Sequence, residues 1–88
     1  MLELLLENSC RKDIKLAKKR GKDLTKLWAM VESLQREEKL PAKHRSHMLT
    51  GNWNSFWECH VEPDWLLVYY FTDRALVLVR TGTHSDLF

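Results

Sequence analysis

The stretch Trp65–Phe71 is almost continuously apolar, and it constrains the fold more than any other feature of this 88-residue chain. A strand with one wet face alternates apolar and polar residues, whereas an unbroken apolar run is typical of a strand covered on both faces. Turn sequences stand on either side of it, at residues 62–64 and 72–74. The sequence therefore predicts an antiparallel meander in which this run lies between strands at residues 56–61 and 75–80.

The N-terminal half has a different periodicity. Residues 2–7 predict a first strand with apolar side chains on both faces. Asn8 or Ser9 can cap a helix over residues 10–20, which Gly21 would end. Asp23 can cap a second helix reaching about residue 38, because apolar residues recur there at spacings of three and four. The short link predicts that the two helices pair antiparallel.

The predicted fold class is α+β, with the order β-α-α-β-β-β in one domain spanning residues 1–88. An antiparallel twisted sheet carries the N-terminal helical hairpin on one face. A polar connection at residues 44–54 joins the helices to the meander, and we expect Leu49 and Trp53 to fix it to the core.

Charge is distributed unevenly. Residues 11–26 carry eight Lys or Arg residues against Asp13 and Asp23, although the whole chain has a net charge of only +2. A block of this kind attracts polyanions, and its alternative interpretation is a solvated helix face. No signal sequence is recognisable, and no stretch approaches the roughly 20 apolar residues of a spanning helix. We therefore expect a cytoplasmic protein with no membrane partner and with Cys10 and Cys59 reduced.

Polar residues with acid–base chemistry gather at the predicted strand ends. Glu58 and His60 share a strand face because they are two residues apart. Asp64 begins the next strand, and Arg80 and His84 follow the last one. Histidine exchanges protons near neutral pH, so such a cluster indicates acid–base catalysis on a phosphate-bearing substrate. Taken singly, each of these residues is better explained as a solvated turn residue or an edge ion pair, because turn and edge polar residues usually are.

Other chemistries fit less well. His44 and His47 have a spacing that zinc can use, but Cys59 and His60 are adjacent in a strand and point to opposite faces. No Cys-x-x-Cys pair, Gly-x-Ser-x-Gly elbow or phosphate-binding glycine loop is present. We therefore expect no metal and no cofactor.

Two motifs resemble the YafQ-type branch of the RelE/ParE toxin superfamily. They are His-Val-Glu-Pro-Asp-Trp at residues 60–65 and Arg-Thr-Gly-Thr-His-Ser-Asp-Leu-Phe at residues 80–88. The Lys-rich segment at residues 12–23 and the segment around His47, Leu49 and Gly51 also resemble that branch. The resemblance covers nearly the whole chain and implies a RelE-like fold.

The resemblance also implies the toxin of a type II toxin–antitoxin system, an endoribonuclease that cuts mRNA in the ribosomal A site. The implied catalytic residues are His47, His60, Asp64, His84, Glu58 and Arg80. The implied RNA-binding residues are Phe88, Trp65, Lys15, Lys18, Lys19, Arg20 and Lys22. Expected partners are a cognate antitoxin, mRNA and the RNA of the ribosome.

The residue types suit RNA cleavage by the substrate's own 2′-OH. That reaction needs a base, an acid and positive charge at the phosphate. We expect His60 to be the base with Asp64 orienting it, His47 or His84 to be the acid, and Arg80 to stabilise charge. Two other functions fit the same fold: a non-catalytic ParE-like gyrase inhibitor, which has no need of the histidines, and a non-catalytic RNA-binding module.

Overall fold

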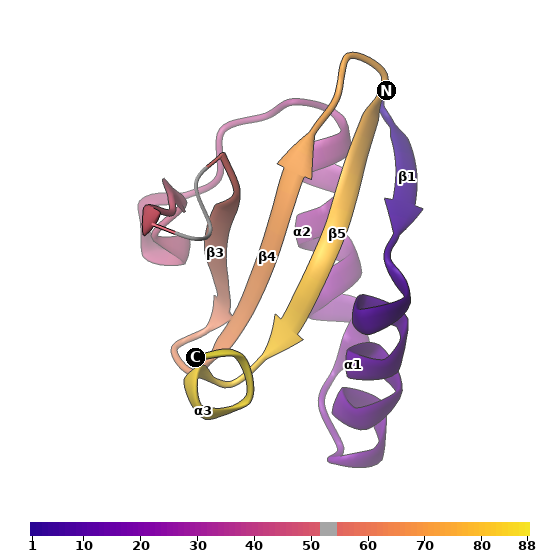
Figure 1. Ribbon diagram of the computed structural model, residues 1–88, viewed down its shortest axis with the longest axis vertical. Helices are drawn as coiled ribbons and strands as arrows, with labels where there is room; N and C mark the ends of the chain where they lie inside the picture. The colour runs from indigo at the N-terminus through magenta and orange to yellow at the C-terminus, as the bar shows by residue number, and fades with distance from the viewer. Residues whose placement is uncertain (52–54) are drawn as a thin grey trace.

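The computed structural model describes residues 1–51 and 55–88 (Figure 1). In chain order its elements are β1 (Glu3–Leu6), α1 (Asn8–Lys19), α2 (Leu24–Gln35), the 3-10 helix η1 (Ala42–His44), β2 (His47–Met48), β3 (Trp57–Glu62), β4 (Trp65–Phe71), β5 (Ala75–Gly82) and α3 (His84–Leu87). No helix among these residues is long and apolar enough to cross a membrane.

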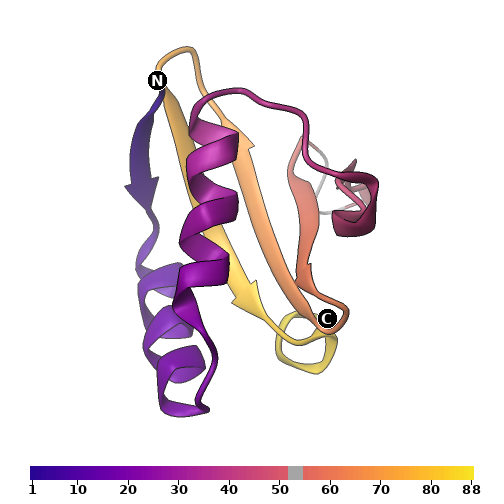
Figure 2. The ribbon, with the colours of Figure 1, turned by 180° about the vertical axis from the view of Figure 1, so that it is seen from behind.

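In the part of the chain that the structure describes, five strands form one sheet in the order β1-β5-β4-β3-β2. The meander of β3, β4 and β5 is antiparallel, whereas β1 joins β5 in parallel, with Glu3 opposite Ala75. The α2 helix crosses one face of the twisted sheet, behind β4 and β5 in Figure 1 and in front of them in Figure 2. The predicted α+β class and the antiparallel meander are confirmed, whereas the short strand β2 lies in the segment that was predicted to be a polar connection.

Apolar side chains of β4 are buried on both faces, as its sequence predicts. Trp65, Leu67 and Tyr69 point into the core under the helices, which also holds Leu27 of α2. Leu66 and Val68 point the other way, into a second, smaller core that includes Leu87 of α3. Burying one such side chain stabilises the fold by about 1.5–3 kcal/mol. The strand therefore holds the sheet between two apolar layers.

Several local predictions differ from the structure. Asp23 caps α2 as expected, accepting a bond from the Thr25 N–H, but the residue before α1 is Glu7, which makes no side-chain cap. Leu5 is 46% exposed, because β1 is an edge strand with one open face. Leu49 packs on the second core as predicted, and Trp53 lies outside the described residues.

Beyond the end of β1, the α1 helix lies along the outer edge of β5. The Ser9 hydroxyl donates to the Val79 carbonyl over 2.8 Å, and the Thr81 N–H donates to Asp13 Oδ2 over 3.1 Å. Arg80 donates to the same carboxylate from Nε over 2.7 Å and from a terminal nitrogen over 3.2 Å. Side chains of α1 thus take the place of a neighbouring strand there.

Both cysteines are free and buried. Cys10 of α1 and Cys59 of β3 are 0% exposed. Burial raises the pKa of each thiol to about 12, so both remain protonated at neutral pH. Neither thiol is available for chemistry in the folded protein.

Removing the Asp13 carboxylate should destabilise the fold. An Asp13→Ala substitution leaves the Thr81 N–H without its acceptor and Arg80 without its partner, so we expect a loss of about 2–3 kcal/mol in the free energy of unfolding. Urea denaturation measures it. The matched control is Asp73→Ala, because Asp73 is exposed in the β4–β5 turn. Equal losses in the two variants would contradict the role given to Asp13.

Candidate active site

A cluster of histidines and carboxylates lies on the face of the sheet that α2 leaves uncovered. Glu58 and His60 of β3 stand opposite Val68 and Leu66 of β4, which belong to the second core. His47 comes from β2, where it pairs with Glu58. Asp64 comes from the β3–β4 turn and His84 from the start of α3. Four separate segments therefore meet, as the sequence predicts.

Asp64 and His84 form a tightly bonded pair. The ring Nδ1–H of His84 donates to Asp64 Oδ1 over 2.7 Å, and the backbone N–H of His84 donates to the same oxygen over 3.0 Å. The backbone bond and then the ring bond lower the pKa of the Asp64 carboxyl, so Asp64 is ionised at neutral pH. We expected Asp64 to orient His60; that prediction is wrong, since Asp64 holds His84.

Glu58 lies between two imidazole rings. Its Oε1 atom is 3.6 Å from His47 Nε2 and 3.7 Å from His60 Nε2. The Glu58 side chain is only 8% exposed, the His60 side chain 12% and the His47 side chain 52%. The His60 and His84 ring centroids are 5.8 Å apart. The cluster therefore extends without interruption from the buried carboxylate of Glu58 to the exposed Asp64–His84 pair.

The hydrogen bonds fix one tautomer for each of these rings. His47 Nδ1 bonds to the Arg45 carbonyl over 2.8 Å, and His60 Nδ1 bonds to the Pro63 carbonyl over 3.2 Å. Carbonyl and carboxylate oxygens only accept, so Nδ1 carries the proton in His47, His60 and His84 alike. In all three rings Nε2 is the nitrogen left to exchange protons.

Two predicted site residues are engaged elsewhere. Arg80 was expected beside the histidines, but its guanidinium is bound by Asp13 of α1. Trp65 was expected to contact RNA; its indole is 1% exposed and donates to Thr81 Oγ1 over 2.9 Å. An indole buried in this way has no surface on which a base can stack, so the prediction for Trp65 is wrong.

The short helix α3 was missed from the sequence. Thr83 caps it in a reciprocal capping box with Asp86, a spacing of three residues that is a recognisable signal for a helix start. Arg20, which was predicted to bind RNA, donates to Asp86 Oδ2 over 2.7 Å. The end of α1 therefore holds the helix that carries His84.

The predicted RNA-binding lysines divide into two groups. Lys22 is paired with Glu62 over 3.1 Å, and Lys26 joins the same carboxylate over 2.9 Å. Lys15, Lys18 and Lys19 are exposed on α1. Phe88, whose side chain is expected to position a base, is 58% exposed at the C-terminal end of α3.

Among residues 1–51 and 55–88, no group of three or more His, Cys, Asp or Glu side chains is arranged to hold a metal ion. The chemistry that the cluster can perform is proton transfer by imidazole and carboxylate groups.

Comparison with known proteins defines the class. The family model described as the bacterial toxin YafQ of type II toxin–antitoxin systems matches residues 2–88. The mRNA interferase toxin YafQ of Escherichia coli K12 is 47% identical over 78 residues, which are 88% of this chain and 85% of that protein.

Solved structures agree with this. A copper-bound mutant toxin from Helicobacter pylori superposes with a TM-score of 0.97 at 40% identity, with all of both chains covered. YafQ in the E. coli DinJ–YafQ toxin–antitoxin complex has a TM-score of 0.91 at 42% identity, covering 99% of this chain and 97% of that one.

The protein is therefore a toxin of the type II toxin–antitoxin class. Matches over nearly the whole length of both chains identify it further: the chain belongs to the YafQ family, and it is an endoribonuclease of that family.

The Arg20–Asp86 ion pair predicts how the Asp86 carboxyl titrates with pH. Arg20 and then the Thr83 N–H hold the pKa of the Asp86 carboxyl well below its ordinary value of about 3.9. A carboxyl with a lowered folded pKa contributes stability that is fully present above the unfolded pKa and is lost as the pH falls through the folded pKa. Carbon NMR of the Asp86 carboxyl between pH 6 and 2 should show an ionised group where free aspartate is half protonated.

An Arg20→Ala variant should move that titration upward, toward the ordinary value. Lys19→Ala is the control, because Lys19 is one residue away on the same exposed stretch of helix. A midpoint near the ordinary value in the parent protein, or one that Arg20→Ala leaves unchanged, would refute the ion pair.

Proposed function

We propose that this toxin is an mRNA interferase that cuts mRNA in the ribosomal A site by attack of a ribose 2′-OH on the adjacent phosphorus. The observation that carries the proposal is the bonded His84–Asp64 pair with the His60 ring 5.8 Å from that of His84, on a face that substrate can reach. The E. coli relative at 47% identity bears the name mRNA interferase.

The reaction needs two proton transfers. The 2′ oxygen forms a bond to phosphorus and loses its proton to a base, while the bond from phosphorus to the 5′ oxygen breaks and that oxygen takes a proton from an acid. The products are a 2′,3′-cyclic phosphate and a 5′-hydroxyl end. Each positioned acid or base is typically worth about 10²–10⁴ in rate.

His84 is suited to act as the base. Asp64 accepts its Nδ1–H, so the lone pair of Nε2 is available to take the proton of the 2′-OH. The charged carboxylate then stabilises the imidazolium that forms. This reverses the roles expected from the sequence, because the orienting carboxylate is bonded to His84.

His60 is suited to act as the acid. The Pro63 carbonyl fixes its ring through Nδ1, and Nε2 stands 3.7 Å from the Glu58 carboxylate. A nearby carboxylate balances the charge of the imidazolium, which is the form that donates a proton. His47 faces the same carboxylate from the other side and lies farther out in solvent, where it contacts the RNA chain.

The exposed lysines of α1 supply the ribosome contact. Lys15, Lys18 and Lys19 project from one helix whose last turn is joined to α3 by the Arg20–Asp86 ion pair. Attraction of lysine to RNA phosphates is strong and independent of sequence. A basic helix tied to the catalytic helix orients the cluster toward the ribosome, and Phe88 stacks on a base of the mRNA.

An antitoxin completes the system. The E. coli YafQ that resembles this chain has been solved in complex with DinJ. We expect a cognate antitoxin to bind this chain in the cytoplasm, where ribosomes and mRNA are present, and to cover the histidine cluster. Neither gyrase inhibition nor RNA binding without turnover requires a cluster of acid–base residues.

Loss of His84 should abolish cutting. We expect His84→Ala to lower the cleavage rate by about 10²–10⁴, and Asp64→Asn to lower it less, since the imidazole remains. Primer extension on translated mRNA after induction of the toxin measures the cuts. Lys39→Ala is the control, because Lys39 is exposed and lies outside the cluster. Undiminished cutting by His84→Ala would remove the proposed base.

Charge reversal on α1 should weaken ribosome binding. The variant Lys15→Glu/Lys18→Glu/Lys19→Glu should pellet less with ribosomes, and its affinity should fall less steeply with salt, by about 0.7–0.9 in logarithmic slope per lost phosphate contact. The control carries Lys39→Glu and Arg74→Glu, which reverse exposed cations outside α1. Equal pelleting by the parent and the α1 variant would exclude this interface.

A further inference from the structure

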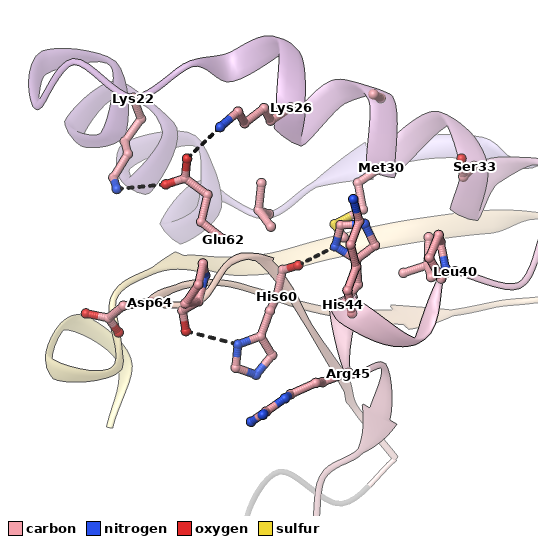
Figure 3. Close-up of a pocket in the computed structure, with 15 residues that line it drawn as sticks. Lys22, Lys26, Met30, Ser33, Leu40, His44, Arg45, His60, Glu62 and Asp64 are labelled. Carbon is pink, nitrogen blue, oxygen red and sulfur yellow. Dashed lines mark hydrogen bonds and ion pairs between the residues drawn. The ribbon is translucent and has the colours of Figure 1, made fainter.

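A groove of about 990 Å³ lies along the edge of β3 and leads to the proposed catalytic residues. The α2 helix forms one wall and the segment from Leu40 to Arg45 the other (Figure 3). β2 pairs only with Trp57 and Glu58, so beyond Glu58 the side of β3 that faces away from β4 has no neighbouring strand among the described residues. His60 and Asp64 stand at the mouth of the groove.

The segment His44–His47 is fixed at this edge by two side-chain bonds, and a third bond within it orients His47. His44 Nδ1 donates to the His60 carbonyl over 2.7 Å, and the hydroxyls of Ser46 and Tyr69 are 3.0 Å apart. His47 Nδ1 donates to the Arg45 carbonyl. The same short segment thus fixes the backbone beside His60 and orients the ring of His47.

Arg45 lies at the centre of this segment in a left-handed conformation, with φ 48° and ψ 43°. Such a conformation is uncommon for residues with a side chain and persists where the surroundings determine it. Figure 3 shows the Arg45 side chain extending past the ring of His60, and both residues line the groove. The strained backbone therefore directs a guanidinium toward the proposed acid.

Arg45 differs from the other cations near the cluster. Arg80 is bound by Asp13, Arg20 by Asp86, and Lys22 and Lys26 by Glu62. Within residues 1–51 and 55–88, no carboxylate lies within ion-pair distance of Arg45. A guanidinium with its donors uncommitted matches the oxygens of a phosphate, which it binds through two parallel N–H bonds.

We propose that Arg45 binds the phosphate at the bond being cut and that the groove holds the sugar–phosphate chain of the RNA leading from it. This rests on the proposed function and gives Arg45 the part that the sequence assigned to Arg80. Lys43 lines the same groove and adds positive charge beside Arg45, which favours a phosphate chain.

An RNA occupant agrees better with these observations than an acidic peptide does. Lys43 and Arg45 line a groove that His60 and Asp64 also line, so a chain lying in it meets the groups proposed to move protons. A peptide would gain nothing from that placement. Binding of an acidic antitoxin segment is therefore the competing outcome of the test.

The test compares three substitutions of Arg45 in ribosomes programmed with mRNA. Arg45→Ala removes the guanidinium, Arg45→Asn removes it while keeping a residue type that tolerates the left-handed conformation, and Arg45→Lys keeps the charge without the planar fork. We expect kcat to fall about 10²–10³-fold in the first two, as for the loss of one donor to a developing charge, and partial recovery in Arg45→Lys. The control is Arg74→Ala, an exposed arginine in the β4–β5 turn.

A second measurement isolates binding. Messenger RNA with a 2′-deoxy sugar at the cleaved position cannot react, so its affinity is measured without turnover. Loss of Arg45 should reduce the salt dependence of that affinity by about 0.7 in logarithmic slope, the value for one contact to a single strand. Unchanged cleavage and an unchanged slope in Arg45→Asn would overturn the proposal, as would normal cleavage with loss of binding to an acidic antitoxin segment.

Failure of the proposed function can be distinguished from failure of the Arg45 proposal. If the parent protein cuts no translated mRNA, the proposed function is wrong whatever Arg45 does. If the parent cuts and Arg45→Asn cuts equally well, only the role of Arg45 is wrong.

Discussion

Burial of β4 on both faces is the constraint on which the rest of the structure depends. Its backbone is bonded to β3 and β5, and its side chains separate the main core from the second core. Glu58 and His60 occupy fixed places on the exposed side because their register with Val68 and Leu66 is fixed. A slip of one residue would turn both toward α2. Chemistry on one face is therefore positioned by packing on the other.

Ion pairs locate the two helices that carry charge or chemistry. Asp13 ties α1 to the edge of β5, and Arg20 ties the end of α1 to α3. The exposed Arg20–Asp86 pair contributes little to stability, whereas the Asp13 side chain is only 13% exposed and also accepts the Thr81 N–H. Both pairs also fix geometry, since a small shift of α3 would move the ring of His84 away from that of His60.

Although β2 and α3 were not predicted, strand periodicity and turn residues were sufficient to predict the meander, because two turns bound the apolar run Trp65–Phe71. They were also sufficient to bring His60, Asp64 and His84 together. Side-chain partners could not be derived: Asp64 is near two histidines, and only the three-dimensional turn decides that it bonds to His84. Arg80 was assigned to the site because the sequence gives no sign that Asp13, 67 residues away, would bind it. Arg45 was overlooked because a basic residue in a polar loop is usually solvated.

The parallel pairing of β1 with β5 has a consequence for the order of events during synthesis. A chain emerges from the ribosome N-terminus first, so β1 appears long before the strand that it needs as a neighbour. His84 comes later still, after β5. A nascent chain from which β5 and α3 have not yet emerged therefore has neither the β1–β5 pairing nor the His84–Asp64 bond.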